Sequence, residues 1–404
     1  MNRKRIGFAL SLAMIIAAGV LCAAPVSIEL FSNKPESIQT LQGLIDAFQK
    51  QNPDIKVSLT APPDAETVLK TKLAKDKLPD VFALGGNATY GELAQAKVFA
   101  DLGSMKAAKN VQAAYLDMLA RLVGGNDKTI YGIPYATNAN GVIYNKDKFK
   151  ALGLKVPTTW TEFIALLDKA KKAGETPIYF TLQDAWTGLI PWNSLSSNLI
   201  AKDFPARETA GSTSFAKEYT EVATKIAKLA EYGHADNAGV GYNDGNIAFA
   251  NGKSVLYLQG NWAIPDILKA NPKANIGVFA MPVSDDPAKN NLVSGVDVLL
   301  AVSATTKKAD AAKKFVEFMA TKDIAQRYIN EQSAFSAVKG VLQQNPVVEG
   351  YKVNFEKGKL SSFADHYYPA GFDAASLIQA YLIDKDQAAF LAKMDSAWKT
   401  ITNH

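Results

Sequence analysis

The chain has 404 residues, a formal net charge of +5 and 10% aromatic residues. That length excludes a single small module and is enough for two or three domains with a sizeable core. The lysines are scattered over polar helix faces instead of being clustered, which argues against nucleic acid as a partner. No stretch beyond the N-terminal segment is long and apolar enough to cross a membrane.

The N-terminal segment, residues 1–24, has the pattern of an export signal. Three basic residues precede an apolar stretch over residues 6–21, and the small residues Ala23 and Ala24 follow it. We therefore expect a cleaved signal and an extracytoplasmic protein, whose net charge falls to +2 because the leader carries three basic residues and no acidic one. An uncleaved membrane anchor is the alternative, because the apolar stretch is near the lower length limit for spanning a bilayer.

Cys22, the only cysteine, lies within this leader. The mature chain is therefore expected to contain no disulfide and no cysteine metal ligand. A cysteine at the end of an apolar export signal also resembles the acylated cysteine of bacterial lipoproteins, although Leu21 before it is a poor match. Two locations stay open, the periplasm and the cell surface as a lipoprotein held through Cys22.

After the leader, strand and helix patterns alternate. The predicted elements are a strand at 27–31, a helix from 38 to the stop at Asn52 and Pro53, a strand at 55–59, a helix at about 65–77 and a strand at 81–84. This order predicts an α/β fold with an open sheet of mainly parallel strands and helices on both faces. Such sheets place ligands at the carboxyl ends of their strands, where Gly85, Gly86 and Asn87 follow the third strand.

The central and C-terminal parts continue the alternation. The β-rich passage from Thr129 to Tyr144 is interrupted by Pro134 and polar residues, which suits a chain that crosses between two lobes. The later predicted elements are a helix opened by a capping box at Thr159 and Glu162 and ended by Gly174, a strand at 177–181, a helix at 214–232, strands at 255–258 and 298–302, and one long helix at 309–330.

Several motifs of cofactor and metal chemistry fail. A phosphate-binding loop would need a glycine where Ile247 stands, and a dinucleotide fingerprint would need one at Asp244. The three histidines lie far apart without metal-ligand spacing, so we expect no metal and no cofactor. A glycosidase carboxylate pair formed by Asp184 and Asp297 stays open, because both adjoin strands and their separation is not visible in the sequence.

A different combination of residues fits a sugar. Sugars present ring hydroxyls and weakly apolar C–H faces, so their sites combine aromatic rings with amide and carboxylate side chains in a partly dry cleft. The strand ends supply the candidates Asn87, Asp184, Trp186, Asn261 and Trp262, and further candidates are Asn138, Asp297 and Tyr367. Each aromatic residue also has a packing interpretation, which we favour for Trp160 and Trp398 and leave open for Trp192 and His366.

The order and spacing of several motifs resemble the extracellular solute-binding proteins of ABC sugar importers, the broad family that includes maltose-binding protein. The motifs that carry the resemblance are Leu78–Val81 with the glycine turn behind it, Tyr131–Pro134 with Gly141–Lys146, Pro157–Phe163, Gln259–Trp262, and Ala309–Met319 before Ser336–Gly340. The resemblance extends over essentially the whole mature chain.

The resemblance implies a two-lobe periplasmic-binding-protein-like fold of type II with the ligand cleft between the lobes. The expected segments are a signal peptide at 1–24, an N-terminal lobe from 25–137 and 294–334, and a C-terminal lobe from 138–293 and 335–404. It adds Asn33 and Glu36 to the candidate site and implies that Trp186 and Trp262 stack on sugar. Asn138 replaces a glutamate of maltose-binding protein, which puts maltose itself in doubt.

The expected function is non-enzymatic capture of an oligosaccharide outside the membrane and its delivery to the membrane subunits of an ABC permease. We expect a monomer with no cofactor and no metal. Two alternatives remain, a secreted carbohydrate-active enzyme and the same fold with another small solute such as a polyol.

Overall fold

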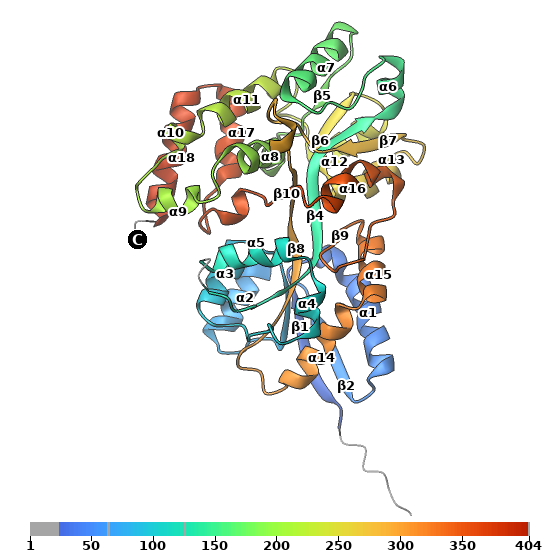
Figure 1. Cartoon of the computed structure of the whole chain (residues 1–404), viewed down its shortest axis with the longest axis vertical. Coiled ribbons are helices and arrows are strands. Elements are labelled where there is room, and N and C mark those ends of the chain that lie inside the picture. The colour runs from blue at the N-terminus through green and yellow to red at the C-terminus, as the bar shows by residue number, and fades with distance from the viewer. Residues whose placement is uncertain (1–23, 63–64, 125–126, 403–404) are drawn as a thin grey trace, which may run out of the picture.

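The computed structural model describes residues 24–62, 65–124 and 127–402. The predicted signal, apart from Ala24, and the lipoprotein position Cys22 lie outside these residues. The described chain forms two lobes, one above the other in Figure 1, and the long strands β4 (Ile133–Asn145) and β8 (Leu292–Val302) run through both. Across the described residues, no helix combines the length and apolarity that a bilayer span requires.

The N-terminal lobe is built on three parallel strands. These are β1 (Val26–Ser32), β2 (Ile55–Thr60) and β3 (Val81–Leu84). Its helices are α1 (Ile38–Gln51), α2 (Ala65–Ala74), α3 (Ala88–Gln95), α4 (Lys106–Asn110), α5 (Ala113–Val123), α14 (Ala309–Met319) and α15 (Lys322–Gln332), with the 3-10 turn η1 (Pro35–Ser37) before α1.

The C-terminal lobe has shorter strands and more helices. Its strands, and the short strands near the crossing, are β5 (Ile178–Tyr179), β6 (Leu256–Gly260), β7 (Ile276–Phe279), β9 (Phe335–Ser336) and β10 (Leu360–Ser361). The helices are α6 (Lys146–Ala151), α7 (Trp160–Lys172), α8 (Leu189–Leu199), α9 (Phe204–Thr209), α10 (Phe215–Glu218), α11 (Thr220–Ala230), α12 (Tyr242–Ala250), α13 (Ile264–Ala270), α16 (Glu349–Glu356), α17 (Ala374–Asp384) and α18 (Gln387–Thr402). Short 3-10 turns are η2 (Ala185–Gly188), η3 (Asn261–Ala263), η4 (Pro287–Lys289), η5 (Pro346–Val348) and η6 (Asp365–Tyr367).

One sheet joins the two lobes, in the order β2-β1-β3-β8-β4-β6-β5. The expected parallel pairing holds for β2, β1 and β3 and again for β5 and β6. The expectation of a mainly parallel sheet was wrong at its centre, where β8 is antiparallel to both β3 and β4, and β4 is antiparallel to β6 and β7. The reason is that β4 carries the chain out of the first lobe and β8 brings it back.

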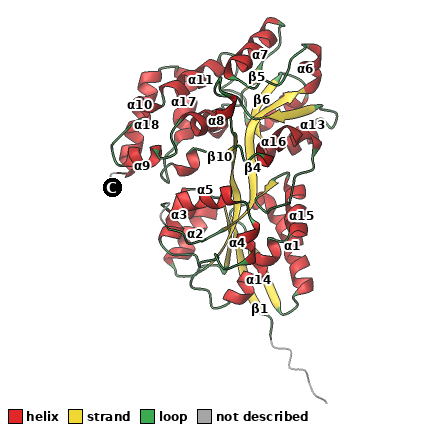
Figure 2. Ribbon diagram, viewed as in Figure 1, coloured by secondary structure: helices red, strands yellow, loops and turns green. Residues whose placement is uncertain are grey.

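Alternating side chains bury both faces of the N-terminal sheet. Leu30 of β1, Val81 of β3 and Leu300 of β8 pack in one core with α1, α14 and α15, whereas Phe31 and Phe82 pack in another core with α3 and α5. A strand covered on both faces reads as a continuous apolar run, which is the pattern of β3. Figure 2 shows the resulting order of helices, strands and helices.

The C-terminal lobe repeats this arrangement. Val142 and Leu256 point into a core with α7, α8, α11, α17 and α18, while Ile143 and Tyr257 point into a second core with α12, α13 and α16. The cores of the two lobes meet along β4, β8 and the segment that follows β9. The loops at the carboxyl ends of β1, β3 and β6 are therefore fixed by cores on both sides.

Two predicted helices are each two helices in the structure. The helix expected at 214–232 is divided at Tyr219 into α10 and α11, and the one expected at 309–330 is divided at Ala320 and Thr321 into α14 and α15. Neither division contains glycine or proline. The capping box at Thr159 and Glu162 is confirmed, because the Thr159 hydroxyl accepts from the Glu162 amide and the Glu162 carboxylate accepts from the Thr159 amide.

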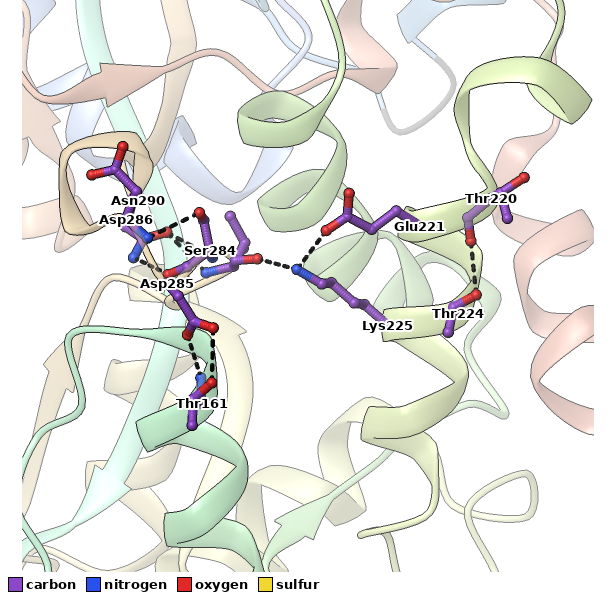
Figure 3. A network of polar contacts seen from close by, with 10 residues as sticks. Thr161, Thr220, Glu221, Thr224, Lys225, Ser284, Asp285, Asp286 and Asn290 are labelled. Atoms are coloured by element: carbon purple, nitrogen blue, oxygen red, sulfur yellow. Dashed lines mark hydrogen bonds and ion pairs between the residues drawn. The ribbon is translucent and has the colours of Figure 1, made fainter.

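The loop between β7 and β8 is tied to two helices of the C-terminal lobe (Figure 3). The Thr161 hydroxyl at the start of α7 donates to the Asp285 carboxylate at 2.8 Å, and Lys225 of α11 donates to the Val283 carbonyl at 2.6 Å. The Lys225 ammonium also lies 4.9 Å from the centre of the Trp160 ring. Trp160 therefore has the packing role that we favoured, and it anchors the chain that leads into β8.

Candidate ligand-binding site

Three of the predicted residues meet at the carboxyl ends of β1 and β3. The Asn33 amide donates to the Ala83 carbonyl at 3.1 Å, which holds the two strand ends together. A Cβ added to Gly85 would lie 3.9 Å from the side-chain nitrogens of both Asn33 and Asn87, and 3.7 Å from the Asp297 carbonyl. Asn33, Asn87 and Asp297, which were predicted on separate grounds, thus lie together on one wall of the N-terminal lobe.

The side chains of this wall line a small hollow, and one of them, Asn87, also caps a helix. The hollow is lined by Asn33 and Asn87 together with Phe31, Leu69, Leu84 and Tyr90. The side-chain oxygen Oδ1 of Asn87 caps α3 by accepting from the Tyr90 backbone amide at 3.3 Å. This cap fixes the side chain of Asn87 and leaves its NH₂ group directed away from the helix.

An ion pair lies beside this wall. The Lys34 ammonium is 2.6 Å from the Asp297 carboxylate, and the Asn138 side chain donates to the same carboxylate oxygen at 3.3 Å. The side chains of Lys34 and Asp297 are 22% and 24% exposed. The sequence reasoning missed Lys34, although it stands between the candidates Asn33 and Glu36 on the same loop.

The C-terminal lobe reaches the same place through η6. A Cβ added to Gly295 of β8 would lie 3.2 Å from the His366 ring, which also stacks on Phe363 at 4.9 Å between ring centres. Burial lowers the pKa of His366, the nearby Lys34 charge lowers it further, and Asp365 and Asp297 oppose that shift. The imidazole is thus a neutral polar group beside the Lys34–Asp297 pair.

Several buried polar atoms of this group have no hydrogen-bond partner within the described chain. They are Asn33 Oδ1, Asn138 Oδ1, Asp365 Oδ1 and His366 Nδ1. Buried polar groups are hydrogen-bonded as a rule, and an unsatisfied one costs about 1 to 3 kcal/mol. Four such atoms around one ion pair are the arrangement expected of a site that binds hydroxyl groups.

A second group of predicted residues lies at the carboxyl end of β5. The Asp184 carboxylate accepts from the Tyr242 amide at 2.6 Å and so fixes the start of α12. The Trp186 ring is 38% exposed and lies 5.1 Å from the Tyr242 ring at an angle of 56°. The Trp186 ring is therefore an accessible aromatic surface. Asp184 fixes the position of Tyr242, whose ring lies beside that of Trp186.

Trp262 and Asn261 follow β6. The Trp262 ring packs over Gly260 and against both cores of the C-terminal lobe, and it is only partly buried. Asn261 is 2% exposed; its side-chain oxygen accepts from the Ala139 amide and its nitrogen donates to the Ser333 carbonyl, both at 2.7 Å. These bonds connect β6 with β4 and with the end of α15.

The two remaining candidates are Tyr367 and Glu36, which lie in surroundings different from those of the two groups above. Tyr367 lies under the Arg121 guanidinium, 4.0 Å from the ring centre, and its hydroxyl donates to the Met118 carbonyl at 3.3 Å. Arg121, which sequence reasoning missed, also donates to the Lys202 carbonyl at 3.0 Å. Tyr367 thus joins η6 to α5 across the lobes. Glu36 lies on η1, and its side chain is outside the described part of the structure.

No group of three or more His, Cys, Asp or Glu side chains suited to a metal ion occurs in the part of the chain that the structure describes.

The fully buried Trp192 donates from its ring nitrogen to the Tyr368 hydroxyl at 3.0 Å, which gives it a core role. Amides, one ion pair and a neutral imidazole can bind hydroxyl groups, and exposed indole rings can cover a sugar face.

Known proteins share both the sequence and the fold. The sequence profile described as "Bacterial extracellular solute-binding protein" matches residues 32–326. A multiple sugar-binding protein of Streptococcus mutans is 34% identical over 330 residues, which are 78% of this chain and 76% of that protein. The melibiose/raffinose/stachyose-binding protein MelE of Bacillus subtilis is 23% identical over 342 residues, which are 81% and 78% of the two chains.

Solved structures agree with the sequence matches. The apo-form of RafE from Streptococcus pneumoniae superposes with a TM-score of 0.82 at 28% identity and covers 94% of this chain and 99% of its own. RafE in complex with raffinose gives a TM-score of 0.78 at 29% identity, with 93% and 100% covered. The expected two-lobe fold is confirmed by this likeness.

Proposed function

The chain belongs to the bacterial extracellular solute-binding proteins, and on that premise we propose that it captures an oligosaccharide between its lobes and delivers it to the membrane subunits of an ABC permease. Extracellular solute binding is the function of the family as a whole. The identity of the solute is the part that the proposal adds.

The observation that carries the proposal is the group of unpartnered polar atoms around the Lys34–Asp297 pair. These atoms come from the loop after β1, from β4 and from η6, which are segments of both lobes. Three of the four atoms belong to neutral amide and imidazole groups and the fourth to the Asp365 carboxylate, and groups of all these kinds can bind a hydroxyl group. Ligand hydroxyls would satisfy atoms that the protein leaves unpaired.

The aromatic residues supply the second wall. We propose that Trp186 and Trp262, which follow parallel strands β5 and β6 of the C-terminal lobe, cover the C–H faces of sugar rings. The exposure of Trp186 supports this role, as does the position of Trp262 at the edge of two cores. Indole rings combine a large apolar face with a low entropy cost on binding.

Oligosaccharides of two to four units are the proposed ligands. Support comes from one relative, MelE, whose name specifies melibiose, raffinose and stachyose, and from the structural neighbour in complex with raffinose. The family is described by solute binding, and we propose that this chain performs no chemistry on the sugar. Asp184 and Asp297, the candidate glycosidase pair, are each engaged by protein groups, Tyr242 and Lys34 respectively.

We further propose the lobe limits 25–137 with 294–334 and 138–293 with 335–404, an export signal at 1–24, and a monomeric protein in the periplasm or on the cell surface. Division of the buried side chains into separate cores on either side of Asn138 supports the first limit. The limit at 334 has no such support, because Ala337 and Val338, which follow it, are buried in the cores of the N-terminal lobe.

A thermal-shift screen of residues 25–404 against melibiose, raffinose, stachyose, maltose and sorbitol tests the ligand class. A ligand at 100 times its Kd stabilises the folded state by about 2.7 kcal/mol, so a cognate oligosaccharide is expected to raise Tm by several degrees. A shift with sorbitol alone would select the polyol alternative, and no shift with any sugar would contradict the proposal.

A further inference from the structure

The strand order of the sheet arranges the candidate residues of the proposed site in a row. In the order β8-β4-β6-β5, Asp297 lies on β8, Asn138 lies on β4, Trp262 follows β6 and Trp186 follows β5. Because β5 and β6 are parallel, the turns that follow them leave the same edge of the sheet. Neighbouring strands lie about 4.8 Å apart, so the three steps from β8 to β5 span about 14 Å. The proposed site is therefore elongated, with Asp297 at one end and Trp186 at the other.

Two aromatic rings lie together at the β5 end of this row. Trp186 is on η2, and Tyr242, which the sequence analysis did not single out, is the first residue of α12. The ring centres are 5.1 Å apart and the ring planes are inclined by 56°, so the two rings form an open angle. Trp186 is exposed and Tyr242 is partly buried. An indole face, a phenol face and a phenol hydroxyl together suit the C–H face and the hydroxyl groups of one sugar ring.

Asp184 fixes one ring of this pair through the backbone. Its carboxylate accepts from the Tyr242 amide at 2.6 Å, whereas Gly241, the residue before the helix, has no side chain that could cap α12. A Cβ added to Gly241 would lie 3.1 Å from the same carboxylate oxygen, so the two segments are in close contact. A carboxylate at this position satisfies an amide that the helix leaves unpaired and is favoured by the helix dipole. Asp184 therefore acts on the site through the position of Tyr242.

We propose that Tyr242 contacts the ligand and forms, with Trp186, a terminal subsite for the third and later units of an oligosaccharide. This inference deepens the proposed function and rests on it. The unpartnered polar atoms of the proposed site lie around β8 and β4, and Trp262 follows β6, so a disaccharide can fill that part of the row. A tri- or tetrasaccharide is long enough to reach the two rings at β5 as well. This end of the site thus sets a preference for chain length.

Calorimetry with melibiose, raffinose and stachyose, which are a di-, a tri- and a tetrasaccharide, tests the subsite. The parent protein is expected to bind the two longer sugars at least about tenfold more tightly than melibiose, because only they reach the aromatic pair. Tyr242→Ala is expected to lower the affinity for the longer sugars by at least about tenfold and that for melibiose by less than about twofold. Trp186→Ala, a change at an exposed ring, is expected to give the same pattern, so the test does not depend on the stability of one variant.

Three further variants make the result specific. Asp184→Ala removes the acceptor of the Tyr242 amide and is expected to reproduce the length-dependent loss, whereas Asp184→Asn keeps an acceptor and is expected to retain most of the affinity. Trp160→Ala is the matched control, because Trp160 is also a partly buried aromatic residue at the first position of a helix in the same lobe. The Trp160 ring packs beside the Lys225 ammonium, and its removal is expected to leave the affinity for all three sugars unchanged.

Failures of the two proposals are distinguishable. If the parent protein binds none of the three sugars, the proposed function fails whatever the variants do. If the parent binds them and Tyr242→Ala and Trp186→Ala weaken melibiose and stachyose equally, or weaken neither, the terminal subsite alone is overturned. Binding of melibiose by the parent as tightly as stachyose would overturn it as well.

Discussion

The Trp262 ring lies so close over Gly260 that a Cβ added to the glycine would be 2.1 Å from the ring. Gly260 has φ −98° and ψ 176°, a conformation that any residue adopts, so the glycine is needed for space and not for its backbone freedom. The last residue of β6 thus determines where the proposed sugar-stacking ring can lie.

Gly260→Ala is expected to displace the Trp262 ring and to lower sugar affinity at least tenfold, because the added methyl cannot share the space of the indole. Calorimetry with the cognate sugar measures this loss. Gly211→Ala serves as the control, since Gly211 has φ +69° and nothing within 4 Å of its would-be Cβ. The control is expected to lose about 1 kcal/mol of stability and no affinity; equal affinities in the two variants would contradict the stacking role of Trp262.

Trp186→Ala is expected to lower affinity by about 30- to 1,000-fold, the range of 2 to 4 kcal/mol for an aromatic anchor. Because the ring is 38% exposed, the free energy of unfolding should change little. Trp192→Ala is the converse case: this indole is fully buried and bonded to Tyr368, so its loss should cost about 3 to 5 kcal/mol of stability. Urea unfolding and calorimetry on both variants compare these outcomes, and undiminished affinity in Trp186→Ala would remove that ring from the site.

Asn261→Ala is expected to destabilise the fold by roughly 2 to 4 kcal/mol, because it leaves the buried Ala139 amide and Ser333 carbonyl without their partner. Asn261→Asp keeps the acceptor for Ala139 and should recover part of that stability. Unfolding curves of both variants measure the difference. A loss of affinity with an unchanged unfolding curve would instead make Asn261 a ligand contact.

Glu208 of α9 predicts an unusual pH dependence of stability. It is 3% exposed, and burial, reinforced by the Asp395 charge, raises the pKa of its carboxyl to about 7. The unfolded carboxyl ionises near pH 4.5, so between pH 4.5 and 7 the folded state binds more protons and its stability falls as pH rises. Glu208→Gln should remove that loss.

The expected gain for Glu208→Gln is about 3 kcal/mol at pH 8 and close to zero at pH 4, because one pKa unit corresponds to about 1.4 kcal/mol. Urea unfolding at the two pH values gives the comparison. Glu349→Gln, a change at an exposed side chain, is the control and should show no pH-dependent gain. Equal stability of Glu208→Gln and the parent protein at pH 8 would mean that the buried carboxyl is not destabilising.

The parts of the fold that depend on local sequence could be predicted. The capping box at Thr159 fixes the start of α7 through groups three residues apart, and the apolar run of β3 follows from burial on both faces. The division between α14 and α15 could not be predicted, because Ala320 and Thr321 carry no helix-breaking signal. Packing of Phe315 and Tyr328 into one core sets the two helices instead.

The candidate site, like the fold, has one part that could be predicted from the sequence and another part that could not. The position of Asn87 was predictable from the rule that ligands bind beyond the carboxyl ends of strands, whereas Asn33 was proposed only from the family resemblance. The pairing of Lys34 with Asp297 was not predictable, because 263 positions separate the two residues in the chain. Likewise, the two backbone partners of Asn261 come from β4 and from the residue after α15, and only the folded chain brings them together.

Titration of the mature protein with raffinose and stachyose, followed by chromatography of the recovered sugar, tests the central claim of oligosaccharide capture most directly. We predict one intact sugar molecule bound per chain with a Kd near 1 μM, which corresponds to about −8 kcal/mol. Absence of binding to every di- to tetrasaccharide tried, or release of monosaccharide in excess of the protein, would contradict it.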